Sequence, residues 1–402
     1  MLSEHALRLI DRARLSVFRA PAHSTDIGQL LANRSEGLRV GIARFDGIGD
    51  WVLTLPLIAA LARHPGVREV VLFGHRSHVS LLQRFVGVTV VGEDVWASHH
   101  TPWPHGAVGK LLAISALGQR RARRRGQAHP DRVDLMVLPR WDTDRGQNCV
   151  AFAAGVGAPV LAHDPRLQPQ ATRKEAGDAR GIAILVRDER PEAHELDRLA
   201  PLAAAAGCPR LADTDEIRGM LGLPARIRTG GPRPIALHTG AHDAFRRWPL
   251  DRWKELVLAL LDRQDQDLLL VGGPTDAETH EHLIRLDPRR VRRTTGDLGD
   301  LFETLDGAQL LVGGDSGPAH MAAAVGLPVV VISAYPHGDV PGHPNSPDRF
   351  GARSDGGVRI LRPPPARAPF DELNVPAREQ LIATIEVQQV LTAMDELRGG
   401  PR

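Results

Sequence analysis

The sequence predicts an α/β protein in which short parallel strands alternate with helices in two successive halves. Short apolar runs that end in glycine-containing turns recur along the chain, and each is followed by a stretch with helical spacing. A segment rich in glycine, proline and polar residues, 212–234, separates one such series from the next. Short apolar strands of this kind are typical of parallel sheets that helices cover on both faces.

The elements of the two halves follow one another regularly. In the first half, strands are predicted at residues 38–45, 69–74, 88–91, 134–138 and 158–162, and helices at 51–63 and 77–85. In the second half, strands are predicted at 234–238, 267–271, 309–312 and 328–333, and helices at 250–262, 275–286, 298–305, 317–325 and 377–397. We therefore expect two Rossmann-like halves, which bind ligands at the carboxyl ends of their strands and, where two halves face each other, in the cleft between them.

The length of 402 residues fits two domains, or three, at the usual domain size. We place an N-terminal domain at 1–215, a linker at 216–233, a second domain at 234–370 and a terminal helix at 371–402. The formal net charge is only +2, which excludes a surface built as a whole for polyanions. We therefore expect no nucleic-acid partner, and any anion site is local.

Cysteine usage and the N-terminal segment indicate a cytoplasmic protein. Cys149 and Cys208, the only cysteines, give no disulfide framework and no four-cysteine zinc site, and they fit a reducing compartment. Residues 1–20 lack a signal-peptide core, and no apolar run approaches the ~20 residues of a membrane span. The amphipathic spacing of 1–20 predicts either a membrane-surface helix or a helix packed on its own domain, so we expect at most peripheral contact with the inner face of the cytoplasmic membrane.

The first candidate site is the turn after the first strand, Arg44-Phe45-Asp46-Gly47-Ile48-Gly49-Asp50. Its glycines let the chain pass close to a ligand, and Asp50 falls at the start of the following helix. An aspartate there either caps the helix or acts on a ligand. Neither the G-x-G-x-x-G fingerprint nor a P-loop is present.

Three segments of the second half carry polar residues at strand ends. His238, Thr239 and Gly240 end the first strand, and Arg246 and Arg247 follow just before a helix. Guanidinium groups match phosphate oxygens in charge and geometry, although arginines that precede a helix are also common surface residues.

Further along, Asp276 begins a helix after the glycines of a second strand end, where it either caps that helix or accepts hydrogen bonds from a ribose. The segment after the strand at 309–312 brings Asp315, Ser316, Gly317 and His320 to the start of a small-residue helix. The N–H groups and positive dipole end of such a helix suit a diphosphate. The alternative is a well-capped core helix with a satisfied histidine.

Four segments, RFDGIGDWVLTLP, LHTGAHDAFRRWPLDRW, LVGGPTDAE and GGDSGPAHMAAAVGLPVV, occur in this order. Together, over residues 38–335, they resemble glycosyltransferase family 9, the ADP-heptose:lipopolysaccharide heptosyltransferases and their relatives. The resemblance implies a GT-B fold, with an acceptor domain and a donor domain facing a central cleft and a C-terminal helix that crosses back to the first domain. It also implies inverting transfer of a heptose or related sugar from an ADP-sugar, without a cofactor or a catalytic metal.

The resemblance also assigns roles by position. Asp50 matches the acidic residue that acts as general base. The residues that match the donor site, or lie in its matching segments, are His238, Thr239, Gly240, Arg246, Arg247, Asp276, Asp315, Ser316, Gly317 and His320. Arg246 stands where relatives usually have lysine, and Thr275, beside Asp276, stands where they have an acidic residue near the ribose. The arginine at 246 bears on how the donor is held, and the threonine at 275 bears on which nucleotide the donor carries.

The anionic acceptor is expected to meet basic residues of the first domain. Candidates are Arg44 and three arginines of the only dense basic run, Arg121, Arg123 and Arg124, although a run of this kind is more commonly a solvated helix face. The extended loop 334–350 could line or close over the donor sugar. Its histidines and those of HHTPWPH, 99–105, have no regular ligand spacing, so we expect no metal site.

Other activities remain open at this stage. The acceptor is a glycan such as lipopolysaccharide core, or alternatively a protein or a small metabolite. A nucleotide-sugar epimerase or hydrolase, or a non-catalytic sugar-nucleotide binding subunit, would use the same fold without the transfer chemistry.

Overall fold

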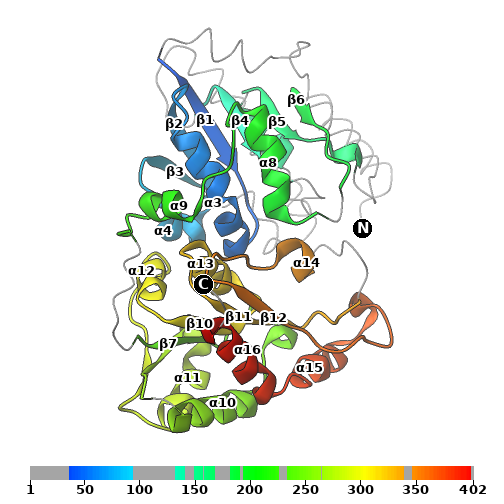
Figure 1. Ribbon diagram of the computed structural model, residues 1–402. Coiled ribbons are helices and arrows are strands. Elements are labelled where there is room, and N and C mark those ends of the chain that lie inside the picture. The colour runs from blue at the N-terminus through cyan, green and yellow to red at the C-terminus, as the bar shows by residue number, and fades with distance from the viewer. Residues whose placement is uncertain are drawn as a thin grey trace. The chain divides into compact units, whose positions relative to one another are not determined.

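The structure, a computed structural model, describes residues 36–93, 132–140, 149–156, 158–167, 182–190, 193–225, 233–263, 265–338 and 346–399 (Figure 1). The chain forms two compact units, of which the first holds one parallel sheet and the second holds another. The main boundary falls between Ala212 and Asp213, close to the predicted domain end at 215. Within these residues no helix has the length and apolar character that crossing a membrane requires. The predicted N-terminal helix lies outside them.

The first sheet has six parallel strands in the order β3-β2-β1-β4-β5-β6. Its strands are β1 (Leu38–Ala43), β2 (Val67–His75), β3 (Val88–Glu93), β4 (Leu135–Leu138), β5 (Val160–His163) and β6 (Ile184–Val186). The described helices of this half are α3 (Ile48–Ala62), α4 (Val79–Leu82), α6 (Cys149–Val156) and α8 (Glu195–Ala205). Two 3-10 turns, η1 (Arg76–His78) and η3 (Pro165–Leu167), lie between them. This is the strand order of a doubly wound dinucleotide-binding fold. All five predicted strands of this half are confirmed, and among its described residues the three-residue β6 was not predicted.

The second sheet repeats this order. Its strands, from one edge to the other, are β9 (Val291–Arg293), β8 (Leu268–Val271), β7 (Ile235–His238), β10 (Leu310–Gly314), β11 (Val329–Ile332) and β12 (Val358–Leu361). Its helices are α9 (Thr214–Met220), α10 (Leu250–Arg263), α11 (Ala277–Ile284), α12 (Leu301–Asp306), α13 (Gly317–Ala324), α14 (Pro347–Phe350), α15 (Val375–Ala383) and α16 (Val387–Gly399), with 3-10 turns η5 (Ala244–Arg246), η6 (Pro274–Asp276) and η7 (Phe370–Glu372). The four predicted strands are confirmed. The short outer strands β9 and β12 were not predicted, since neither is a buried apolar run.

Helix α10 shows how the pattern of apolar residues sets the packing. Trp253, Leu256, Val257 and Leu260 recur at spacings of three and four residues and are the buried residues of this helix. Such a stripe lies on one face of a helix and packs against the sheet. Asp251 in the first turn and Arg263 in the last complement the helix dipole.

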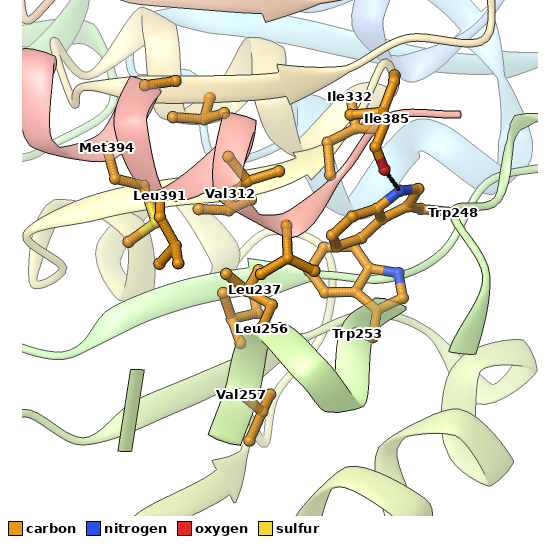
Figure 2. Close-up of a cluster of buried hydrophobic side chains, with 14 of the residues drawn as sticks. Leu237, Trp248, Trp253, Leu256, Val257, Val312, Ile332, Ile385, Leu391 and Met394 are labelled. Atoms are coloured by element: carbon orange, nitrogen blue, oxygen red, sulfur yellow. Dashed lines mark hydrogen bonds between the residues drawn. The ribbon is translucent and has the colours of Figure 1, made fainter. Parts of the chain in front are cut away.

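The terminal helices complete the core of the second unit. Val390, Leu391 and Met394 of α16 are buried in the same cluster as Leu237 and Val312 of the sheet (Figure 2). The terminal helix was expected to be continuous over 377–397 and to cross back to the first domain. The chain forms two helices over these residues, and α16 contacts β11, β12 and α10 of its own unit. The crossing to the first domain stays a prediction.

A tryptophan ties these helices to the rest of the core. Trp248, just before α10, packs edge-on against Trp253 with ring centroids 5.1 Å apart. Its Nε1–H donates a hydrogen bond of 3.0 Å to the carbonyl of Ile385, between α15 and α16 (Figure 2). The contact therefore joins segments that are 137 residues apart in the chain.

Trp248→Phe is expected to lower the free energy of unfolding by about 1–3 kcal/mol, because it leaves a buried carbonyl without this donor and removes ring volume. Urea unfolding followed by circular dichroism measures the change. Leu258→Ala, on the exposed side of α10 at 52% exposure, is the control and is expected to change stability by less than about 0.5 kcal/mol. Equal losses in the two variants would contradict the role assigned to Trp248.

The predicted linker, 216–233, begins inside a helix. Helix α9 starts with a capping box in which Asp213 and Glu216 bond each other's backbone N–H groups. Arg218, 2% exposed, donates to the Asp306 carboxylate at 2.6 Å and to the carbonyls of Val325 and Pro224. These bonds hold α9 in the second unit, so an extended linker is wrong for residues 216–220.

Candidate functional site

The predicted site residues gather where the strand order reverses. In the first sheet this point lies between β1 and β4, and in the second between β7 and β10. In open α/β sheets, ligands bind beyond the carboxyl ends of the strands at this switch point. The R-x-D-x-x-G-D turn follows β1, the His238 loop follows β7 and the Asp315 loop follows β10. The topology therefore places each predicted motif at a binding edge of its own sheet.

Asp50 lies within helix α3 rather than before it. The helix begins at Ile48, so the half-buried Asp50 is the third residue and belongs to the first turn. The carboxylate is close to the positive end of the helix dipole, where a negative charge is stabilising. The sequence allowed Asp50 to cap the helix or to act on a ligand. Because Asp50 lies inside α3 and not at the residue before it, it is not the N-cap residue. Its role as a base stays a prediction.

A buried ion network supports the turn that precedes Asp50. Arg44 Nε donates to Asp46 Oδ1 at 2.7 Å, and Arg140, at the end of β4, donates to Asp46 Oδ2 at 2.8 Å. Arg44 also donates to Thr54 Oγ1 of α3 at 2.9 Å. Burial by itself would raise the pKa of Asp46, but the charges and hydrogen bonds of the two arginines outweigh it and lower that pKa.

Arg44 therefore requires a correction. It was expected to contact the acceptor, but it is 1% exposed and enclosed by Asp46 and Thr54. A guanidinium held this way fixes the turn and does not reach a ligand. The other acceptor candidates, Arg121, Arg123 and Arg124, lie outside the described residues, as do the histidines of 99–105.

On the second sheet, the loop after β7 contains buried polar groups. His238 Nδ1 donates to the Val271 carbonyl at 2.8 Å, and burial lowers the pKa of this imidazole, so it is neutral near pH 7. Thr239 is 6% exposed, and its hydroxyl finds no partner among the described residues. Gly313 of β10 lies against His238, where an added Cβ would come within 3.0 Å of the His238 Cβ. The absence of a side chain thus lets β7 and β10 approach at the switch point.

Asp276 faces the interior of the loop after β8. It is 6% exposed and accepts a hydrogen bond of 2.9 Å from the N–H of Gly273. A side chain at Gly240 or Gly272 would collide with its carboxylate. Asp276 makes no side-chain cap to α11. The structure thus shows it shaping this loop, and its proposed contact with a ribose stays a prediction.

The two arginines at the end of η5, Arg246 and the following Arg247, differ in their surroundings. Arg246 Nη2 donates to the backbone carbonyl of Asp315 and so joins the loop after β7 to the loop after β10. Arg247 is exposed, and its Nε donates to the Ala241 carbonyl at 2.9 Å. Arg246 is therefore the one that lies directly beside the start of α13.

The start of α13 has no side-chain cap from the residue that precedes it. Ser316 occupies the position before the helix in an extended conformation, and its hydroxyl donates to the Gly314 carbonyl at 3.1 Å rather than capping the helix. The Ser316 side chain therefore does not cap the N–H groups at the start of α13. Arg246 lies next to this helix start.

His320 lies in the first turn of α13 and is 7% exposed. Burial lowers its pKa; the Asp315 charge opposes this effect and the Arg246 charge adds to it. Its Nδ1 finds no partner among the described residues. A neutral imidazole with an unused nitrogen at this edge suits hydrogen bonding to a ligand hydroxyl or phosphate.

Two residues at the binding edges were missed by sequence reasoning. Arg140 follows β4 and pairs with Asp46, and Ser333 follows β11 and donates to Asp315 Oδ2 at 3.4 Å. The available signal was their position at the ends of predicted strands: Ser333 is the last residue of 328–333, and Arg140 lies two residues after 134–138. Among the described residues there is no cluster of three or more His, Cys, Asp or Glu side chains that would hold a metal ion.

Comparison with known proteins supports the resemblance found in the motifs. Residues 215–338 match the family model described as glycosyltransferase family 9 (heptosyltransferase). No curated protein sequence matches the chain significantly. The resemblance to this family is confirmed over the matched residues and supports a glycosyltransferase.

Solved structures share the fold. The glycosyl transferase family 9 protein from Veillonella parvula is 17% identical with a TM-score of 0.60, covering 90% of this chain and 97% of its own. Heptosyltransferase WaaC of E. coli, solved with ADP, is 16% identical with a TM-score of 0.56, covering 89% and 99%. The E. coli ADP-heptose lps heptosyltransferase II is 17% identical with a TM-score of 0.56, covering 89% and 98%. At this identity the similarity shows the fold, which is the two-sheet α/β fold of GT-B glycosyltransferases.

Proposed function

We propose that the protein is an inverting glycosyltransferase that moves a heptose or related sugar from an ADP-sugar to a hydroxyl of an anionic glycan acceptor such as lipopolysaccharide core. The observation that carries the donor half is the start of α13 at the switch point of the second sheet, where Ser316 makes no side-chain cap and Arg246 bonds the backbone carbonyl of the preceding Asp315. This segment lies inside the residues that match the heptosyltransferase family. The family resemblance supports the donor and acceptor classes.

The proposed reaction needs a base and a group that stabilises the leaving diphosphate. Asp50 takes the proton of the acceptor hydroxyl as that oxygen forms its bond to the anomeric carbon. The bond from this carbon to the diphosphate oxygen breaks on the opposite face, so the configuration inverts and ADP leaves. Arg246, Arg247 and the N–H groups of Ser316 and Gly317 stabilise the charge that develops on ADP.

These cationic and N–H groups neutralise the charge of the leaving diphosphate, which a divalent metal does in other reactions with a phosphate leaving group. We therefore propose that no metal or organic cofactor takes part. Turnover that is unchanged after chelation with EDTA is the expected result.

The function is tested by offering ADP-, GDP- and UDP-sugars to the protein and measuring binding by mass spectrometry, then transfer to candidate acceptors. Binding of an ADP-sugar, followed by a product of inverted anomeric configuration in its NMR spectrum, is expected. Release of free sugar without transfer to any acceptor would indicate a hydrolase instead. Binding without any turnover would indicate the non-catalytic subunit.

Arg246→Ala is expected to weaken the affinity for the ADP-sugar by about tenfold to a hundredfold, because it removes a charged hydrogen-bond donor next to the diphosphate. Isothermal titration calorimetry measures the dissociation constant. Arg246→Lys is expected to recover part of the affinity, since it keeps the charge but not the planar fork. Arg252→Ala, an arginine of α10 paired with Glu255, is the control. An affinity in Arg246→Ala equal to that of Arg252→Ala would remove Arg246 from the donor site.

A further inference from the structure

The segment that follows β11 is tied down at both of its described ends by one arginine. Arg362, just after β12, donates from Nε to the Tyr335 carbonyl at 3.0 Å and from Nη2 to the Pro336 carbonyl at 2.7 Å. Its Nη1 donates to both carboxylate oxygens of Asp348, at 2.8 and 2.9 Å. Tyr335 and Pro336 lie near the start of the extended segment 334–350, and Asp348 lies near its end.

The surroundings of Arg362 make this a fixed clamp rather than a loose surface pair. Its side chain is 9% exposed and bonds the adjacent carbonyls of Tyr335 and Pro336 as well as the carboxylate of Asp348, whose own side chain is 70% exposed. The guanidinium is planar and rigid, so each of these bonds restricts the others. The backbone adds a further bond, in which the N–H of His337 donates to the Pro363 carbonyl at 2.9 Å. The first end of the segment is thus fastened along the residues that follow β12.

A second set of contacts connects the residues bonded by Arg362 with the loop after β10, where the donor site is proposed. Ser333 is fully buried; its Oγ accepts from the N–H of Tyr335 at 3.3 Å and donates to Asp315 Oδ2 at 3.4 Å. The pairing of Gly314 with Ile332 in neighbouring strands β10 and β11 brings these two strand ends level. Arg246 holds the backbone carbonyl of the same Asp315. Asp315 is therefore restrained through its main chain on one side and through its carboxylate on the other.

We propose that Ser333 and Arg362 are positioning residues of the donor site: Arg362 fixes the segment after β11, and Ser333 transmits that constraint to the Asp315 carboxylate, which orients the sugar of the donor. This inference rests on the proposed function. A carboxylate repels a diphosphate but accepts hydrogen bonds from sugar hydroxyls. Loosening Asp315 therefore weakens the hold on the sugar and leaves the hold on the nucleotide diphosphate, which the start of α13 and Arg246 supply.

The test compares Arg362→Gln and Ser333→Ala with a control variant on β12, the strand that Arg362 follows. Arg359 of β12 is also an arginine in an ion pair, with Glu396 at 2.7 Å, but its partner lies on α16 and not in the segment 334–350. Arg359→Gln therefore removes a comparable charge and surface pair next to the clamp. Thermal unfolding of each variant shows whether it is folded, and Ser333→Ala provides a second route if Arg362→Gln is unstable.

Affinities for ADP and for ADP-heptose are measured by calorimetry for every variant. Arg362→Gln and Ser333→Ala are expected to raise the dissociation constant of ADP-heptose about tenfold while changing that of ADP less than about twofold. Arg359→Gln is expected to change neither. Asp348→Asn is expected to reproduce the Arg362→Gln effect, and the double variant Asp348→Asn with Arg362→Gln to lose no more than either single variant, since the pair acts as one unit.

Hydrogen exchange gives a readout that does not involve a ligand. The amides of residues 334–338 are expected to exchange faster in Arg362→Gln than in wild type, and at the wild-type rate in Arg359→Gln. Equal weakening of ADP and ADP-heptose would overturn the positioning of the sugar. Variants that bind both probes as the wild type does would overturn the inference alone, whereas a wild-type protein that binds neither probe would remove the proposed function and this inference with it.

Discussion

Asp50→Asn is expected to reduce sugar transfer by about 10²–10⁴-fold while leaving the affinity for the ADP-sugar donor as in the wild type. The amide keeps the size and shape of the side chain in the first turn of α3 but accepts no proton from the acceptor hydroxyl. Initial rates of transfer give the loss, and calorimetric titration of the donor shows that binding is kept. A fall in kcat without a change in donor affinity is the signature of a base.

A matched control separates the loss of a base from the loss of a helix-terminal charge. Asp251 also lies in the first turn of a helix, α10, where it pairs with Lys254 at 3.1 Å. Asp251→Asn removes the same charge from an equivalent position and is expected to leave transfer unchanged. Undiminished turnover in Asp50→Asn would exclude Asp50 from the mechanism, and weakened donor binding in that variant would assign it to the donor instead.

Asp46→Asn is expected to lower the free energy of unfolding by about 3–5 kcal/mol, the largest stability effect predicted for this protein. Asp46 is 4% exposed, and its carboxylate pairs with both Arg44 and Arg140. An amide in its place removes the negative charge from a buried network that contains two guanidinium groups. Urea unfolding at pH 7 measures the difference from wild type.

Glu69→Gln provides the control for this experiment. Glu69 also pairs with an arginine, Arg39, at 2.6 Å, but its side chain is 31% exposed. Because solvent screens such a pair, the loss is expected to stay below about 1 kcal/mol. Equal losses in Asp46→Asn and Glu69→Gln would show that burial of the Arg44 network adds nothing.

The lowered pKa of Asp46 gives the same network a pH dependence. A carboxyl whose pKa is lower in the folded than in the unfolded state stabilises the fold above its unfolded pKa, and this contribution is lost as pH falls through the folded pKa. The wild type is therefore expected to lose stability below about pH 4, and Asp46→Asn to lose less over the same interval. Parallel stability curves for the two proteins would contradict this assignment.

Much of the candidate site could be predicted because its residues are neighbours in the chain. The turn that ends in Asp50, and the loop of Asp315, Ser316 and Gly317, each follow an apolar run and begin a helix, so a local pattern was sufficient to place them. The terminal helix shows where this reasoning failed. Its apolar spacing was recognised, but the break between α15 and α16 was not, and spacing does not tell which surface receives the apolar face.

The sequence by itself determined the alternation of strands and helices, the order of the motifs and the strand ends on which they lie, because periodicity and turn residues act within a few positions of the chain. Only the tertiary structure decided that Arg44 is buried against Asp46 with Arg140, 94 residues beyond that aspartate, and that Ser333 meets Asp315. Those contacts depend on which strands lie side by side and in which register. That choice arises from packing across the whole sheet, and no local pattern records it.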